Sequence, residues 1–226
     1  MKNNSLLKRE ILTRGKTKFT KNMVFAVKML NPKVIFEFGA FNGADTLFYR
    51  GTFPDAEIYS FEPDPVLYEE AKPLLEEERI RFYNYAISDA PGTVDFHYWR
   101  GLEDKDYHGP AGSFFDYTDQ ARKDHSCRWE FVSEPLKVKC ITLKDFCQEN
   151  EINHINFIHM DVEGAIHLVL RGMGDLRPEL IYAEIESDKV FKGALAPRQY
   201  TELFLEMGYV PIDRNGADVL FKLKGS

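Results

Sequence analysis

The sequence predicts an α/β fold in which helices cover both faces of a mostly parallel sheet. Three observations support this fold class. Short apolar segments alternate with helical segments along most of the 226 residues. Four of the apolar segments end in acidic residues, at Glu37, Glu62, Asp161 and Glu184. The last two apolar segments have the pattern of a hairpin, which would add an antiparallel strand at the edge of the sheet.

The individual elements follow from apolar periodicity and from the residues that begin and end them. Thr20, Asp64 and Thr142 each precede a helical segment and are suitable N-caps, and Pro65 suits a first helical turn. Helices are predicted at about residues 21–30, 44–50, 65–78, 143–150, 165–171 and 198–207. Strands are predicted at about residues 34–37, 57–62, 79–87, 93–98, 137–141, 155–161, 180–186, 208–212 and 218–223.

The first strand leads into a glycine turn, residues 39–43, which is followed directly by a helix. Gly39 lets the backbone turn tightly without a side chain in the way. Gly43 lets the start of the helix approach whatever lies on the turn. In an open parallel sheet, ligands bind at the carboxyl ends of the strands, so this turn is the expected site of a nucleotide-like ligand.

Two segments stand outside this regular alternation. Residues 1–18 are basic and are expected to form a solvated arm, or a flap that contacts an anionic substrate. From residue 99 to about residue 136 the periodicity fades, while aromatic residues remain frequent, which argues against disorder. We therefore divide the chain into an arm and helix, residues 1–33, and a domain, residues 34–226, with an inserted segment at about 99–136 that faces the acceptor.

Composition excludes several classes of protein. The formal net charge of -7 argues against nucleic-acid binding, which needs a basic surface. The three cysteines form neither a disulfide framework nor a zinc-binding pattern, which is typical of a reducing compartment. No apolar stretch approaches the roughly 20 residues of a membrane span, and the basic first residues contain no apolar run of signal-peptide length. We therefore expect a cytoplasmic protein with no nucleic-acid partner and no membrane span.

The acid at the end of the second strand restricts which cofactor is expected. Glu62 follows the glycine turn by about 20 residues, the place of the acid that hydrogen-bonds ribose hydroxyls in nucleotide-binding folds. The turn lacks both the G-x-G-x-x-G spacing of dinucleotide sites and the lysine of a P-loop, which argues against NAD and ATP. S-adenosylmethionine carries no phosphate, and Glu37 can accept a hydrogen bond from its ammonium group. The predicted cofactor is S-adenosylmethionine.

Several short motifs occur in a fixed order. They are Glu37-Phe38-Gly39-Ala40-Phe41-Asn42-Gly43, Phe61-Glu62-Pro63, Asn84-Tyr85-Ala86-Ile87-Ser88, Gly112-Ser113, Thr142-Leu143, Asp161-Val162-Glu163-Gly164 and Leu170-Arg171-Gly172. With these motifs, about residues 34–221 resemble the FkbM-type methyltransferases. This resemblance implies the Rossmann-like fold of class I enzymes and S-adenosylmethionine-dependent O-methyl transfer.

The resemblance also assigns residues to the cofactor. Glu37, Gly39 and Gly43 would hold the methionine part, Glu62 the ribose, and the strand end at Ala86 would lie by the adenine. The full set of expected cofactor-binding residues is Glu37, Gly39, Ala40, Asn42, Gly43, Glu62, Pro63, Ala86 and Asp161. Two positions depart from the family pattern, since His159 replaces a lysine and Ile166 replaces a glutamate.

His159, Asp161 and Glu163 are the expected catalytic residues. His159 and Asp161 are two apart on a strand and so face the same side, where an imidazole beside a carboxylate can take a proton from an alcohol. Two alternatives remain open: His159 as a buried structural histidine, and Glu163 as a residue that stabilises the start of the next helix. We assign no metal ligands, although Asp161, Glu163 and Glu184 offer the oxygen atoms that Mg²⁺ or Ca²⁺ prefers.

The predicted reaction is methylation of a hydroxyl on a small molecule, most simply a sugar of a glycan or of a nucleotide sugar. The aromatic residues of the inserted segment would form the acceptor wall, because aromatic rings stack on sugar faces. They are Tyr107, Phe114, Phe115, Tyr117, Trp129 and Phe131. The resemblance also implies a part in polysaccharide biosynthesis. Two alternatives use the same fold: a nicotinamide-dependent oxidoreductase, and a non-catalytic module that binds a partner protein.

Overall fold

The computed structural model describes residues 19–126, 129–185 and 189–226. Within these ranges, seven strands form a central sheet in the order β11-β12-β10-β9-β1-β2-β3. Its strands are β1 (Val34–Phe38), β2 (Glu57–Phe61), β3 (Arg81–Tyr83), β9 (Phe157–Met160), β10 (Leu180–Glu184), β11 (Tyr209–Asn215) and β12 (Asp218–Leu223). All neighbouring pairs from β10 to β3 are parallel, and β12 is antiparallel to both β10 and β11. The predicted mostly parallel sheet with an antiparallel C-terminal hairpin is confirmed.

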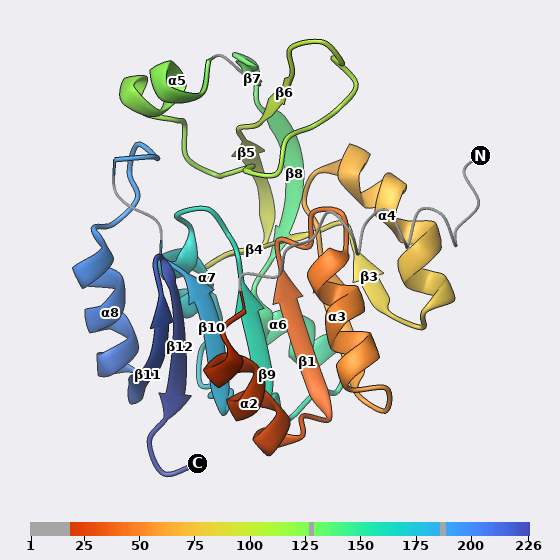
Figure 1. Cartoon of the computed structure of the whole chain (residues 1–226), viewed down its shortest axis with the longest axis vertical. Coiled ribbons are helices and arrows are strands. Elements are labelled where there is room, and N and C mark those ends of the chain that lie inside the picture. Colours follow the sequence, from red (N-terminus) through yellow and green to blue (C-terminus); the bar gives the residue numbers. More distant parts are fainter. Residues whose placement is uncertain (1–18, 127–128, 186–188) are drawn as a thin grey trace.

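Helices cover both faces of this sheet (Figure 1). On one face lie α2 (Lys21–Leu30), α3 (Ala44–Thr52) and α4 (Pro65–Glu77). On the other face lie α6 (Leu143–Glu149), α7 (Ile166–Gly172) and α8 (Pro197–Glu206). The three N-caps predicted from the sequence are present, since Thr20, Asp64 and Thr142 each accept a hydrogen bond from a backbone N–H in the first turn of their helix.

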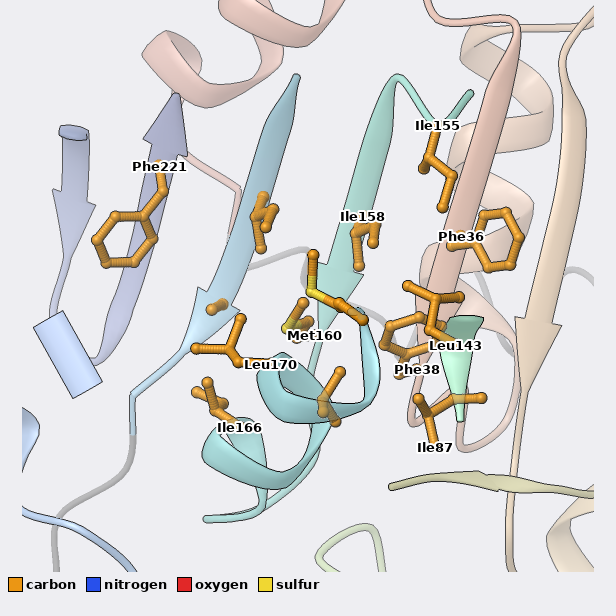
Figure 2. Packing of buried hydrophobic residues seen from close by; sticks show 14 of the residues in the cluster. Phe36, Phe38, Ile87, Leu143, Ile155, Ile158, Met160, Ile166, Leu170 and Phe221 are labelled. Carbon is orange, nitrogen blue, oxygen red and sulfur yellow. The ribbon is translucent and has the colours of Figure 1, made fainter. Parts of the chain in front are cut away.

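Alternation along the strands divides the core into two layers. Phe36, Ile158 and Phe221 point to the α6–α8 face, where they pack with residues of α6 and α7 (Figure 2). Their sequence neighbours Ile35 and Phe157 point to the α2–α4 face. The same alternation places Glu37 and His159 on the α2–α4 face, two residues beyond Ile35 and Phe157 on the paired strands β1 and β9.

The helix α2 joins this core, although its sequence precedes the predicted domain boundary. Met23 and Val27 are buried against the α2–α4 face of the sheet. Thr20 Oγ1 donates a hydrogen bond to the Asp213 carboxylate on β11. The basic arm predicted over residues 1–18 lies outside the described residues.

The prediction of a single strand at residues 79–87 is wrong, because this part of the chain forms two short strands in different sheets. β3 ends at Tyr83 in the central sheet, and β4 (Ala86–Ile87) pairs with β8 (Leu136–Ile141) in a small sheet that β5 (Gly92–Phe96) completes. Asn84 explains the break: its side-chain amide donates to the carbonyl oxygens of Glu62 and Pro63, at 2.8 and 3.0 Å, and directs the chain out of the central sheet.

The inserted segment is folded and lies above the carboxyl edge of the central sheet (Figure 1). It contains the antiparallel pair β6 (Trp99–Gly101) and β7 (Trp129–Phe131) and the helix α5 (Asp119–His125). Trp99, Tyr117, Ala121 and Phe191 form a small separate core beneath these elements. The segment therefore has its own packing, which fixes it over the strand ends.

The carboxyl ends of β1, β2 and β9 are held together at Gly39. The N–H groups of Gly39 and Ala40 both donate to the Phe61 carbonyl at 3.0 Å, and the Asp161 N–H donates to the Phe38 carbonyl at 2.9 Å. Gly39 has φ +85°, and a Cβ there would lie 1.9 Å from the Asp161 carbonyl oxygen. Only glycine fits a left-handed position with backbone so close.

Replacing Gly39 tests this close approach. Gly39→Ala should lower the free energy of unfolding by clearly more than the roughly 1–2 kcal/mol of a left-handed alanine, because the new methyl group also overlaps the Asp161 carbonyl. The matched control is Gly216→Ala, since Gly216 has φ +64° but no atom within 4 Å of the added Cβ. Denaturant unfolding measures both, and equal losses would contradict the predicted overlap.

Candidate active site

A cavity of about 750 Å³ opens at the carboxyl edge of the sheet, beneath the inserted segment. Most of the predicted site residues line it: Gly39, Ala40, Asn42, Glu62, Pro63, Ala86, His159, Asp161 and Glu163. Glu37 and Gly43 are not among the lining residues. Gly43 is the N-cap of α3 and packs against Leu75, and Glu37 lies below the turn, 1 % exposed. The structure therefore brings seven of the nine expected cofactor residues to the surface of one cavity, with Glu37 and Gly43 supporting them from behind.

Glu62 lies at the centre of the cofactor side. Its Oε2 accepts a hydrogen bond from the Phe41 N–H at 2.7 Å, and its Oε1 accepts one from the Asp64 N–H at 2.9 Å. Burial raises the pKa of this carboxyl to about 8, although the hydrogen bonds from the two N–H groups lower it. The nearby Asp64 and Asp161 carboxylates raise it further. A buried acid held in this way can accept hydrogen bonds from ligand hydroxyls on the side that faces the cavity.

Glu37 belongs to a row of polar side chains buried under α3. Parallel pairing places Ser60, Glu37, His159 and Tyr182 side by side on β2, β1, β9 and β10. Glu37 accepts hydrogen bonds from Ser60 Oγ at 3.0 Å and from the Thr46 hydroxyl of α3. The carboxylate is therefore fixed by two hydroxyl groups, which the sequence analysis did not identify as part of the site.

His159 occupies the middle of this row and also lines the cavity. Its Nδ1 lies 3.7 Å from Glu37 Oε1, beyond hydrogen-bond distance, and the ring packs against Phe19, Tyr49 and Tyr182. Burial lowers the pKa of the imidazole, but the carboxylates of Glu37, Asp45 and Asp161 outweigh it and raise the pKa to about 9. At neutral pH the ring is thus a cation among carboxylates.

The loop after β9 has an unusual backbone. Glu163 has φ +45° and Gly164 has φ +84°. Ser113 of the inserted segment donates to the Glu163 carbonyl at 2.6 Å, and Tyr200 of α8 donates to the Gly164 carbonyl at 2.5 Å. A non-glycine residue in the left-handed region is stabilised here from both sides, as is common at functional sites. The N-cap position of α7 is Ala165, which makes no side-chain hydrogen bond to the helix.

The two ends of the cavity differ in character. At one end Ala86, Phe96 and Phe114 present an apolar surface from the small sheet and the inserted segment. At the other end Tyr182, Glu184 and Asp218 present a phenol and two carboxylates from β10 and β12. A long ligand can therefore place a flat apolar group at one end and polar groups at the other.

The aromatic wall expected in the inserted segment is only partly present. Tyr107 and Phe114 line the cavity, with Gly109, Pro110, Gly112 and Ser113 between or beside them. Phe115, Tyr117, Trp129 and Phe131 instead pack with Trp99 and Phe191 in the separate small core. Most aromatic residues of the inserted segment thus stabilise the segment itself, and fewer of them line the cavity.

The oxygen atoms considered for Mg²⁺ are not brought together. Within the described part of the chain, the ligand atoms of Glu37, Asp45 and His159 form the one group of three that lie within 4.8 Å of one another. Asp161, Glu163 and Glu184 form no such group. No helix in the described ranges is long and apolar enough to cross a membrane.

Comparison with known proteins shows which class of enzyme the chain resembles. The chain is similar to a 2-O-methyltransferase, NoeI, of Sinorhizobium fredii, at 30% identity over 178 residues that cover 75% of this chain and 70% of the relative. Solved structures with the same fold include a proposed caffeoyl-CoA O-methyltransferase from Staphylococcus aureus, at 11% identity and a TM-score of 0.52, which covers 100% of this chain and 93% of that one. A methyltransferase of Podospora anserina with bound SAH, PaMTH1, has 11% identity and a TM-score of 0.51, and covers 98% and 87% of the two chains.

The fold is that of class I methyltransferases, and the relatives support an S-adenosylmethionine-dependent methyltransferase. Residues 37–211 match the model of the methyltransferase FkbM domain, and the chain belongs to this family. The O-methyl transfer predicted from the sequence is thereby confirmed at the level of the class. The two alternatives, an oxidoreductase and a non-catalytic module, are not supported.

The raised pKa of Glu62 makes stability depend on pH. The pKa of Glu62 is about 8 in the folded chain and 4.5 for a free glutamate, so the folded chain holds the proton more tightly. The contribution of Glu62 to the free energy of unfolding is therefore fully present at low pH and is lost as the pH rises through 8. Between about pH 5 and about pH 8.5, the wild type should lose more free energy of unfolding than Glu62→Gln. The difference should be on the order of 3 kcal/mol, since one pKa unit corresponds to about 1.4 kcal/mol.

Chemical unfolding of both proteins across this range measures the difference. The pKa of His159 is also raised, but His159 is present in both proteins and its contribution cancels. Parallel stability curves for the two proteins would show that Glu62 does not titrate in this range.

Proposed function

We propose that the chain methylates a hydroxyl group of a sugar, carried by a glycan or a nucleotide sugar, as a step in polysaccharide biosynthesis. The proposed acceptor class is supported by the polar end of the cavity, which presents carboxylates and a phenol. These groups belong to Asp161, Glu163, Glu184, Asp218 and Tyr182. Carboxylates accept hydrogen bonds from hydroxyl groups and so suit a polyhydroxylated acceptor. The similarity to a 2-O-methyltransferase supports transfer to oxygen.

S-adenosylmethionine fits the other part of the cavity. Gly39 and Ala40 of the glycine turn line the cavity, and Glu62 faces it as a buried acceptor for ribose hydroxyls. Ala86 and its apolar neighbours would hold the adenine, and Asn42 and Pro63 complete the lining. The bound cofactor supplies a methyl group on a positively charged sulfur, which is open to attack by an oxygen atom.

We assign Asp161 as the group that takes the proton from the acceptor hydroxyl. Asp161 lines the cavity where the cofactor half meets the polar end, and its backbone is fixed by the contact with Phe38. His159 was the other candidate from the sequence, but a pKa of about 9 leaves it protonated at neutral pH. We propose that His159 stays a cation that balances the Glu37 and Asp45 carboxylates, while Glu163 helps to orient the acceptor.

The remaining contribution of the protein is orientation. Methyl transfer is a direct displacement, so holding the hydroxyl oxygen in line with the methyl group accounts for much of the rate. We propose that the inserted segment, residues 99–136, covers both halves of the cavity and excludes water. Tyr107 and Phe114 on one side, and Ser113 bound to the Glu163 carbonyl on the other, support this placement.

The proton-transfer assignment is tested with Asp161→Asn. Loss of a positioned base lowers rates by about 10²–10⁴-fold, so kcat should fall by at least about a hundredfold. The fall should be present at saturating S-adenosylmethionine, which separates it from any weaker binding of the cofactor. Normal turnover in Asp161→Asn would move the role to another residue.

The pH profile of the wild type separates the two candidates. If His159 is not the base, kcat should show no rise that follows the titration of its imidazole. If His159 were the base, kcat would rise about tenfold per pH unit up to its pKa of about 9.

The acceptor class is tested by a methyl-transfer screen with labelled S-adenosylmethionine. Oligosaccharides and nucleotide sugars should be methylated, and macrolides or catechols with matched hydroxyl groups should react much more slowly. Glu184→Gln should raise KM for the sugar acceptor and leave KM for the cofactor unchanged. Transfer to a catechol but to no sugar would overturn the proposed acceptor.

A further inference from the structure

A buried histidine connects the inserted segment to the cofactor side of the cavity. His108 Nδ1 lies 2.5 Å from Asp64 Oδ2, across 44 residues of sequence. The two side chains are 10% and 1% exposed, so the contact is shielded from water. A carboxylate opposite Nδ1 makes this nitrogen the donor. The centroid of the Tyr98 ring lies 4.4 Å from that of the His108 ring, with the two planes tilted by 30°, and the contact limits rotation of the imidazole.

Asp64 in turn connects His108 to the expected ribose site. The other carboxylate oxygen of Asp64, Oδ1, accepts the Val66 N–H at 2.8 Å and caps α4. The backbone N–H of Asp64 donates to Glu62 Oε1 at 2.9 Å. The position of Asp64 therefore fixes both the start of α4 and the orientation of the Glu62 carboxylate.

The residues beside His108 lie directly on the cavity. Tyr107 precedes it, and Gly109 and Pro110 follow it, and all three line the cavity together with Glu62 and Asp64. Loss of the His108–Asp64 contact would thus free this part of the cavity lining and the support of Glu62 at the same time.

We propose that His108 is a positioning residue for the adenosine part of the cofactor: through Asp64 it orients Glu62 and holds residues 107–110 over the bound ligand. The proposal rests on the assignment of Glu62 to the ribose. The side chain of His108 contacts Asp64, whose backbone N–H holds Glu62, so its effect should fall on cofactor binding and not on the chemical step.

The test compares two substitutions at this position, His108→Leu and His108→Asn. Leucine fills the space but cannot donate, whereas the amide nitrogen of asparagine can replace Nδ1. Calorimetry with SAH should show about a tenfold higher Kd for His108→Leu, equivalent to about 1.4 kcal/mol. His108→Asn should stay within about threefold of the wild type, since only a small part of a buried hydrogen bond is lost. KM for S-adenosylmethionine should follow Kd, with kcat at saturating cofactor nearly unchanged.

A matched control is available within the same segment. His97 Nδ1 lies 3.8 Å from Asp116, and neither residue is among those that line the cavity. His97→Leu should leave the Kd for SAH unchanged. An unchanged Kd in His108→Leu, or an equal rise in both leucine variants, would overturn the proposal.

If His108→Leu does not fold, Asp64→Asn gives the same answer, because asparagine caps a helix as well as aspartate but is a weaker acceptor for His108. It should also raise the Kd for SAH, and a Kd equal to that of the wild type would overturn the proposal. The wild type is measured first: if it binds no SAH, the proposed function fails, whereas wild-type binding with unaffected variants refutes only the role of His108.

Discussion

The contact between Gly39 and the Asp161 backbone sets the geometry of the whole site. It allows the ends of β1 and β9 to lie closer than any side chain would permit, and the hydrogen bonds to the Phe61 carbonyl add the end of β2. Glu62 follows β2 directly, and Asp161 follows β9. The residue expected to hold the cofactor and the residue expected to take the proton are thus fixed relative to each other by backbone contacts, which do not depend on side-chain flexibility.

A row of buried polar side chains supports this arrangement from below. Burying the Glu37 carboxylate is costly unless it is hydrogen-bonded and balanced by charge. Thr46 and Ser60 provide the hydrogen bonds, and the imidazolium of His159 provides the charge. Because His159 also reaches the cavity, the same group that stabilises the core adds positive charge close to Asp161. In the proposed mechanism, His159 has this double role and Asp161 is the base.

Much of the fold could be predicted from local sequence, because local signals determine it. The three helix caps, the parallel strands that end in acids and the closing hairpin all depend on residues within a few positions of one another. The break between β3 and β4 could not be predicted, since it depends on Asn84 reaching the backbone of Glu62 and Pro63, about 20 residues away in sequence.

The site shows the same division between local and long-range signals. The turn at Gly39 and the acid at Glu62 were identifiable from their spacing alone. Thr46 and Ser60 were not, because their contact with Glu37 depends on strand register and helix packing. The aromatic residues of the inserted segment were identified as a ligand wall, but composition does not show which face of a segment is buried. Most of them stabilise the segment itself.

That internal core has a consequence for how the segment can act. Because the segment has its own packing, its contacts with the rest of the domain all belong to one folded unit. One contact, His108 with Asp64, lies at the cofactor side, and another, Ser113 with the Glu163 carbonyl, lies in the loop that also carries Asp161. A third joins Asp116 and Thr118 to the backbone of residues 190–192, beyond β10. One folded segment therefore contacts the side of the cavity that holds Glu62, the loop that carries Asp161 and the backbone beyond β10.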